Sequence, residues 1–127
     1  MKEQEPQGEY NERGAIVLIS SVAGCQGRTE EIAYAPSKGA VNGMVLPWAR
    51  DLSKYGIRVN CISPGPFDTA MAWQISEAAM EGLRKAIPVG RVGSPPEFAH
   101  AAQFLVENTY MTGSILYLDG GLRVPFV

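Results

Sequence analysis

Three runs of β-branched and other apolar residues, separated by connections of more than 30 residues, constrain the fold of this chain more than any other feature. They are AIVLIS (residues 15–20), IRVNCIS (57–63) and SILYLDGG (114–121). The first run is continuous rather than alternating, which is typical of a strand covered on both faces of a parallel sheet. Connections this long favour parallel pairing with right-handed crossovers. The sequence therefore predicts an α/β fold with about three parallel strands.

The connections show helical spacing of their apolar residues. Residues 32–54 repeat apolar side chains every three or four positions, which predicts a helix. Pro36 fits the first turn of that helix, whereas Pro47 in its interior predicts a bend with helix on both sides. Residues 71–87 have a similar pattern, and Ser94 followed by two prolines and Glu97 predicts a further helix as far as Asn108.

Residues 1–13 differ in composition from the rest of the chain. Apart from Met1 they contain no aliphatic side chain, and they are rich in Glu, Gln and Gly. Such a segment buries too little surface to order itself, so we expect a surface loop or a frayed start. At 127 residues the chain has the length of one domain, and we expect residues 14–127 to form one core or part of one.

Composition and charge exclude several classes of protein. The chain is 46% hydrophobic and 19% charged with a net charge of −2, an ordinary balance for a globular protein. No apolar run approaches the roughly 18 residues of a membrane span, and no cationic leader with an apolar stretch opens the chain. We expect neither a membrane span nor a secretory signal. Because the basic residues form no stripe, direct nucleic-acid binding is not expected.

The two cysteines, Cys25 and Cys61, have no CxxC spacing and no Cys/His cluster around them. We therefore expect neither a metal site nor a disulfide scaffold. The cysteine usage is what we expect of a protein in a reducing compartment.

Ser21, Tyr34 and Lys38 are the candidate catalytic residues. Tyr34 and Lys38 are four residues apart near the start of a predicted helix, so both side chains project from one face. A nearby ammonium favours phenolate over phenol and makes a tyrosine a usable general acid/base. Ser21 follows a predicted strand, at the end where open parallel sheets place their ligand groups.

Each of these features alone also has an ordinary structural explanation. A tyrosine with a lysine four residues later arises by chance, and Ser-Ser after a strand is common loop chemistry. The conjunction is more specific: a serine at a strand end, then YAPSK opening a helix, then a second strand ending in NCISPG at Gly65.

These motifs, together with the closing GSILYLDGG, resemble the C-terminal half of a short-chain dehydrogenase/reductase. The stretches LPWARDL, VGRVGSPPEFAHAAQFLVEN and LDGGLR are most similar to the type 2 3-hydroxyacyl-CoA dehydrogenase branch of that family. The resemblance runs from about Glu12 to Val124. It implies the C-terminal part of a Rossmann-type doubly wound parallel sheet, with the three strands at one edge of a larger sheet.

The resemblance also implies roles for individual residues. Ser21 would orient the substrate, Tyr34 would donate or accept the proton, and Lys38 would favour the ionised phenol and bind the nicotinamide ribose. Four further residues match the family's stretch along the nicotinamide end of the cofactor: Pro64, Gly65, Phe67 and Thr69. The implied cofactor is NAD, with NADP not excluded. Residues 70–92 correspond to the family's substrate lid, which would present apolar residues including Met71, Trp73, Ile75 and Met80.

The cofactor half of the family's domain is not recognisable in this sequence. It contains neither GxGxxG nor GxxxGxG, and its isolated glycines fit ordinary turns. The family's acidic ribose-binding residue and upstream catalytic asparagine are also missing. We therefore expect that the chain begins near the middle of the usual domain, and that alone it neither binds NAD tightly nor turns over. Its first strand would then expose a free hydrogen-bonding edge.

The resemblance leaves the biochemical role open between three hypotheses. The first is an oxidoreductase of lipid metabolism acting on 3-hydroxyacyl thioesters or hydroxysteroids. The second is a 3-oxoacyl carrier-protein reductase. The third is a non-catalytic interaction subunit that pairs with another chain, as members of the branch do in mitochondrial RNA processing. The family also implies a homo-oligomer, a dimer or tetramer, and a location in the mitochondrial matrix or the cytoplasm.

Overall fold

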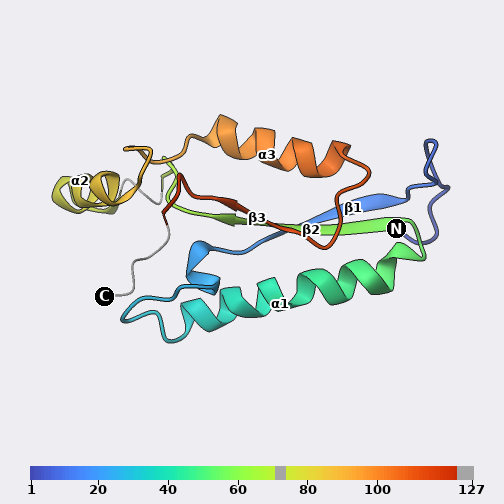
Figure 1. Ribbon diagram of the computed structural model, residues 1–127, viewed down its shortest axis with the longest axis horizontal. Coiled ribbons are helices and arrows are strands. Elements are labelled where there is room, and N and C mark those ends of the chain that lie inside the picture. Colours follow the sequence, from blue (N-terminus) through green and yellow to red (C-terminus); the bar gives the residue numbers. More distant parts are fainter. Residues whose placement is uncertain (71–73, 123–127) are drawn as a thin grey trace.

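The three strands form one parallel sheet in the order β1-β2-β3. The structure, a computed structural model, describes residues 1–70 and 74–122. Strands β1 (Gly14–Ile19), β2 (Ile57–Pro64) and β3 (Ile115–Leu118) lie in that order. Figure 1 shows helix α1 (Tyr34–Ser53) on one face of the sheet and α3 (Pro95–Glu107) on the other. The predicted α/β architecture with parallel strands is confirmed.

The central strand β2 is covered on every side. Its residues 57–63 are all buried, because β1 and β3 pair with its two edges while α1 and α3 cover its two faces. Ile62 packs with Ala101 and Leu105 of α3, and the described core on the α1 side includes Val45 and Ala49. The sequence predicted that the first apolar run, residues 15–20, is covered on both faces. In the structure β1 is only partly buried, and Ile19 is 44% exposed. The reason is that β1 is an edge strand in the described part of the chain.

Helix α1 begins two residues later than predicted and ends one residue earlier. Pro36 is its third residue, where a backbone N–H would have no partner inside the helix. The helix continues on both sides of Pro47, as predicted. The carbonyl that the proline ring approaches belongs to Gly43. Gly56, with φ +69°, turns the chain from α1 into β2.

The elements after β2 match their predictions in part. Helix α2 covers Glu77–Ala86 rather than residues 71–87, because Ser76 caps it by accepting a hydrogen bond from the N–H of Ala79 at 3.2 Å. Met71 and Trp73, expected in the substrate lid, lie outside the described residues. Strand β3 is shorter than the predicted 114–121 and ends in the expected turn, where Gly120 and Gly121 have φ +62° and +84°.

Residues 1–13 form an exposed surface loop that is tied to the fold at its end. Gln7 and Glu12 form an isolated antiparallel bridge. Arg13 donates from Nη1 to the carbonyl of Tyr55 at 3.2 Å, and Glu12 pairs with Arg58 of β2. A short 3₁₀ helix, η1 (Val22–Gly24), follows β1. Within residues 1–70 and 74–122, no helix has both the length and the apolar composition needed to cross a bilayer.

Candidate active site

The carboxyl end of β1 leads directly into the predicted catalytic segment. Ser21 is the N-cap of η1, and its Oγ accepts a hydrogen bond from the N–H of Ala23 at 3.2 Å. This bond fixes the serine side chain at the end of the strand. In Figure 1, η1 and the start of α1 lie at the same end of the sheet, the end where β1 and β2 finish.

Tyr34 and Lys38 lie on successive turns at the start of α1. Tyr34 is the first residue of the helix, and its side chain is half exposed. The Nζ of Lys38 lies 5.8 Å from the centre of the Tyr34 ring, within the range of a cation–π contact. The same Nζ donates to the carbonyl oxygen of Ile19 at 3.3 Å. The ammonium is therefore held between the tyrosine ring and the last residue of β1.

Close packing brings η1 against the start of α1. A Cβ atom built on Gly24 would lie 2.8 Å from the carbonyl carbon of Lys38, so only glycine allows this approach. Ser21, Tyr34 and Lys38 thus belong to two segments that touch at Lys38. The arrangement combines a hydroxyl, a phenol and an ammonium at the carboxyl end of a parallel sheet, which suits proton transfer to a ligand oxygen.

The predicted nicotinamide stretch follows β2 at the same end of the sheet. Pro64 is the last residue of β2, and Gly65 packs against Asp119, whose Cα would be 2.9 Å from a Cβ at position 65. The ring of Phe67 packs edge-to-face on Phe98 of α3, with the ring centres 5.6 Å apart. Thr69 is exposed. Of these four residues, Gly65 and Phe67 already have close packing partners in the protein.

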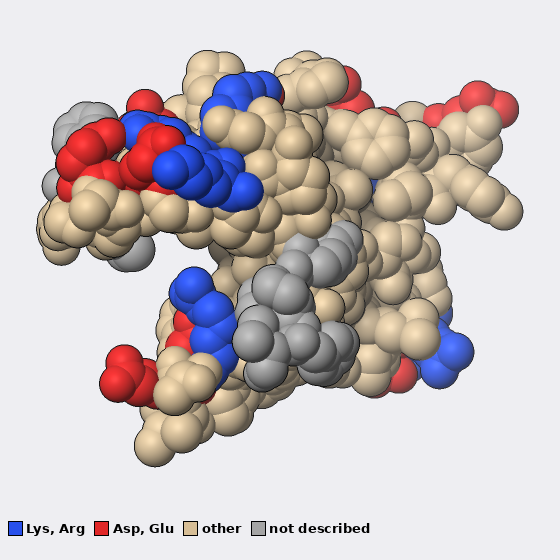
Figure 2. Space-filling view, turned by 60° about the vertical axis from the view of Figure 1, so that its left-hand side comes forward, with Lys and Arg blue, Asp and Glu red and all other residues tan. Residues whose placement is uncertain are grey.

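A small cavity of about 180 Å³ lies beside this stretch. Its lining includes Phe67, Arg91, Glu97 and Asp119. The Arg91 guanidinium forms a two-bonded ion pair with Glu97, at 2.6 and 2.8 Å. Figure 2 looks toward this end of the molecule and shows a hollow in the surface beneath α2, whose acidic and basic side chains lie side by side. Among the described residues, no group of three or more His, Cys, Asp or Glu could hold a metal ion.

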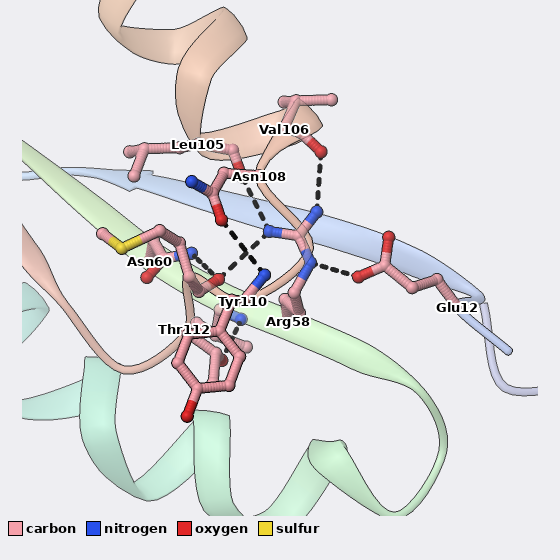
Figure 3. Close-up of polar contacts among 10 residues, drawn as sticks. Glu12, Arg58, Asn60, Leu105, Val106, Asn108, Tyr110 and Thr112 are labelled. Carbon is pink, nitrogen blue, oxygen red and sulfur yellow. Dashed lines mark hydrogen bonds and ion pairs between the residues drawn. The ribbon is translucent and has the colours of Figure 1, made fainter. Parts of the chain in front are cut away.

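A buried polar network at the other end of β2 was not predicted from the sequence. Arg58 donates to the carbonyls of Leu105 at 2.7 Å, Val106 at 2.6 Å and Met111 at 3.1 Å, and it also pairs with Glu12 (Figure 3). Asn60 donates to the carbonyl of Met111 at 2.7 Å. An arginine and an asparagine inside a buried strand were the available signal. The network holds the end of α3 on the sheet and takes no part in the candidate active site.

The chain is similar to known oxidoreductases over almost its whole length. Residues 1–123 match a family model described as enoyl-(acyl carrier protein) reductase. The chain is 39% identical to the 3-hydroxyacyl-CoA dehydrogenase type-2 of Homo sapiens, across 98% of this chain and 48% of the relative. It is 42% identical to a 3-oxoacyl-[acyl-carrier-protein] reductase of Thermotoga maritima, across 87% of this chain and 46% of the relative.

A solved structure agrees with these sequence matches. The crystal structure of 3-hydroxyacyl-CoA dehydrogenase type-2 from Mycobacterium avium superposes with a TM-score of 0.93 at 43% identity. The match covers 98% of this chain and 48% of that one. The chain thus spans about half the length of the relatives it matches. The fold, the matched family model and these relatives together show that the chain belongs to the short-chain dehydrogenase/reductase family.

Proposed function

We propose that this chain carries the catalytic half of an NAD(P)-dependent oxidoreductase that interconverts a secondary alcohol and a ketone, most simply on a 3-hydroxyacyl thioester. The observation that carries the proposal is the position of the Lys38 ammonium, held between the Tyr34 ring and the carbonyl of Ile19 where β1 ends. The substrate class follows from the names of the two relatives above, because both act on acyl thioesters at the C3 oxygen.

The side chains fit the nicotinamide and ribose end of such a cofactor. Tyr34 is half exposed, and Lys38 has donor capacity beyond its bond to Ile19. These two residues would hold the ribose, with Pro64 and Gly65 beside the ring. A pyrophosphate is usually held by a glycine-rich turn between a strand and a helix, which this sequence does not contain. Another polypeptide segment would therefore supply that part of the site.

The residues of this chain would move the proton of the reaction. When bound, the nicotinamide cofactor supplies the hydride acceptor. Ser21 would hold the substrate hydroxyl, and Tyr34 would take its proton as the carbinol C–H bond breaks. The alcohol loses a hydride and a proton and becomes the ketone, and the reverse transfers reduce the ketone. Lys38 would stabilise the negative charge on the Tyr34 oxygen while it lacks its proton.

The missing segment would bind at the free edge of β1. The apolar strand β1 is only partly buried, whereas residues 57–63 of the neighbouring central strand β2 are all buried. A parallel strand on this edge would cover β1 as β1 covers β2. Supplied by the same polypeptide or by another one, the segment would complete both the sheet and the cofactor site.

The test is a complementation assay. The purified chain is mixed with the N-terminal half of the Mycobacterium avium relative, and NADH oxidation is followed with acetoacetyl-CoA as substrate. We expect turnover in the mixture and none from the 127-residue chain alone. Tyr34→Phe should lower kcat by about 10²- to 10⁴-fold, the usual contribution of a general acid/base. Tyr110→Phe is the matched control, because Tyr110 is 97% exposed.

Four outcomes would count against parts of the proposal. Equal activity of the Tyr34→Phe mixture would remove Tyr34 from the mechanism. Turnover by the isolated chain would refute the need for a second segment. A stable complex without activity on either the CoA or the acyl-carrier-protein thioester would favour the interaction-subunit hypothesis, and a preference for the carrier-protein thioester would favour the second enzyme hypothesis.

A further inference from the structure

Ser20, the residue before the predicted catalytic serine, is buried and makes two hydrogen bonds. It is only 2% exposed. Its backbone N–H donates to the carbonyl of Ile62 at 2.9 Å, which ties it to β2. Its Oγ donates to the carbonyl of Lys38 at 2.9 Å, which ties it to α1. Ser20 therefore connects the central strand to the helix turn that carries the lysine.

Two bonds join Lys38 to consecutive residues at the end of β1. The backbone carbonyl of Lys38 accepts from Ser20, and its ammonium donates to the carbonyl of Ile19 at 3.3 Å. A carbonyl inside a helix is already positioned to accept the N–H four residues later, so the helix itself does not need the Ser20 bond. The bond instead sets the position of this helix turn relative to the strand.

Ser63 shows that burial on this face does not by itself bring a hydroxyl a partner. The register pairs Ile19 with Ile62, so Ser20 lies beside Ser63 on the neighbouring strand. Ser63 is 0% exposed, and its Oγ has no hydrogen-bond partner among the residues that the structure describes. The two serines have nearly equal burial and neighbouring positions, but only Ser20 is bonded to α1. Ser63 is therefore a matched control for Ser20.

We propose that Ser20 is a positioning residue for Lys38, holding the helix turn so that the ammonium stays between the Tyr34 ring and the end of β1. The inference rests on the proposed function, in which Lys38 acts on Tyr34. Without the hydroxyl, the described packing of Val45 and Ala49 still holds α1 on the sheet, but the turn at Lys38 loses its link to the strand. A displacement of catalytic groups by about 1 Å can lower the rate by up to about 10²-fold.

Cys61 provides a readout that does not depend on activity. It is 0% exposed on β2, and burial raises the pKa of its thiol, while the Ser20 backbone and the charge of Lys38 act in the opposite direction. The thiol is thus close enough to Ser20 and Lys38 to be influenced by both. Loosening this turn should expose the Cys61 thiol to reagents. Cys25 is exposed and would react as well. The measurement therefore uses a Cys25→Ser background, which leaves Cys61 as the single thiol.

The experiment compares Ser20→Val with Ser20→Thr in the C25S chain. The two variants have the same shape, and only threonine keeps the hydroxyl. We expect S20V to lower kcat about tenfold in the complementation assay with little change in the KM for acetoacetyl-CoA, in line with the cost of a misplaced group. We expect S20V to speed modification of Cys61 by a disulfide reagent about tenfold at unchanged pH. S20T and S63V should resemble the parent in both measurements.

Equal behaviour of S20V and S20T in both measurements would overturn the proposal. It would also be overturned if S20V speeds Cys61 modification only as much as its loss of global stability, measured by urea unfolding, accounts for. If neither position-20 variant folds, Ser20→Ala is compared with the parent by the same criteria. Absence of all activity in the complemented parent would refute the proposed function, while the Cys61 rates would still decide whether Ser20 holds the turn.

Discussion

At the scale of single residues, Arg58 supplies the hydrogen bonds that the end of α3 needs. The last carbonyls of a helix have no partner within it, and two of those in α3 belong to Leu105 and Val106. Both accept from the Arg58 guanidinium, whose positive charge also suits the negative end of the helix dipole. The charge itself is paired with Glu12. One side chain therefore joins the N-terminal loop, the central strand and α3.

Arg58→Met should reduce the free energy of unfolding by about 3 kcal/mol, because it leaves buried carbonyls and a carboxylate without their partner. Arg58→Lys should recover only part of this loss, since an ammonium cannot reproduce the planar array of guanidinium donors. Urea unfolding of the isolated chain measures both effects. Arg50 is an exposed arginine in the last turn of α1, so Arg50→Met is the control. It should change the free energy of unfolding by less than about 0.5 kcal/mol. A stability of R58M within the error of the parent would refute the assignment.

At the scale of elements, the contact between η1 and α1 depends on the absence of a side chain at Gly24. A Cβ there would lie 2.8 Å from the Lys38 carbonyl carbon and from the Asn42 Nδ2. Gly43, in the same helix, has no atom of the described residues 1–70 and 74–122 within 4 Å of where its Cβ would lie. The two glycines therefore differ in what surrounds them, although the same substitution can be made at both.

Gly24→Ala should destabilise the protein by about 1–3 kcal/mol, because the helix backbone would have to move away. Gly43→Ala should stabilise it by about 0.5–1 kcal/mol, since alanine is the better helix former. Thermal unfolding of the two variants, compared with the parent, gives both signs. A stabilising effect of G24A would show that η1 does not pack against α1 in this way.

The start of α3 carries a pH-sensitive ion pair. The Arg91 guanidinium, together with the backbone N–H and hydroxyl of Ser94, lowers the pKa of Glu97 from 4.5 to about 2. A depressed folded-state pKa adds stability above the unfolded value, and that contribution is lost as the pH falls through the folded value. Glu97→Gln should therefore be less stable than the parent at pH 7, and the difference should vanish between about pH 4.5 and 2.

Urea midpoints across this pH range test the expectation for Glu97. Glu107→Gln, at the opposite end of α3, is the control, since its carboxylate faces the negative end of the helix dipole instead. A constant difference between E97Q and the parent from pH 7 to pH 2 would show that the ion pair does not contribute to stability.

At the scale of the whole molecule, β1 has a paired side and a free side. The N–H of Ser20 points toward β2, where it donates to Ile62. Backbone orientation alternates along a strand, so the N–H groups of Ile16 and Leu18 point to the same side, and those of Val17 and Ile19 point to the free edge. This edge is where the proposed second segment would bind.

Hydrogen exchange of the isolated chain should reproduce this alternation. The amides of Ile16 and Leu18 should exchange slowly, and those of Val17 and Ile19 should exchange faster, because no strand of the described chain covers them. Adding the N-terminal half of the Mycobacterium avium relative should slow the exchange of the Val17 and Ile19 amides. Equal protection of all four amides in the isolated chain would show that its free edge is already occupied, for example by a second copy.

Much of this fold could be predicted because it is encoded locally. Apolar runs of strand length and helical spacing depend on nearby residues, so the parallel α/β order and the approximate bounds of α1 and α3 followed from the sequence. Tyr34 and Lys38 were recognisable because YAPSK is a short contiguous motif, and Ser21 because it follows a predicted strand shortly before it. The predicted start of α2 was wrong, because the apolar spacing continues on the N-terminal side of Ser76, the residue that caps the helix.

Contacts between distant segments were decided only by the tertiary structure. The run IRVNCIS predicted a strand. No local pattern shows that the Arg58 guanidinium donates to a carbonyl at the end of α3, nearly fifty residues later. The same holds for Ser20, whose neighbour Ser21 had the recognisable motif while its own bond to Lys38 arises from the packing of β1 on α1. Sequence by itself determined the elements and the candidate chemistry, because periodicity and short motifs are local. Only the folded chain decided which polar groups are buried together, because that depends on how strands and helices pack.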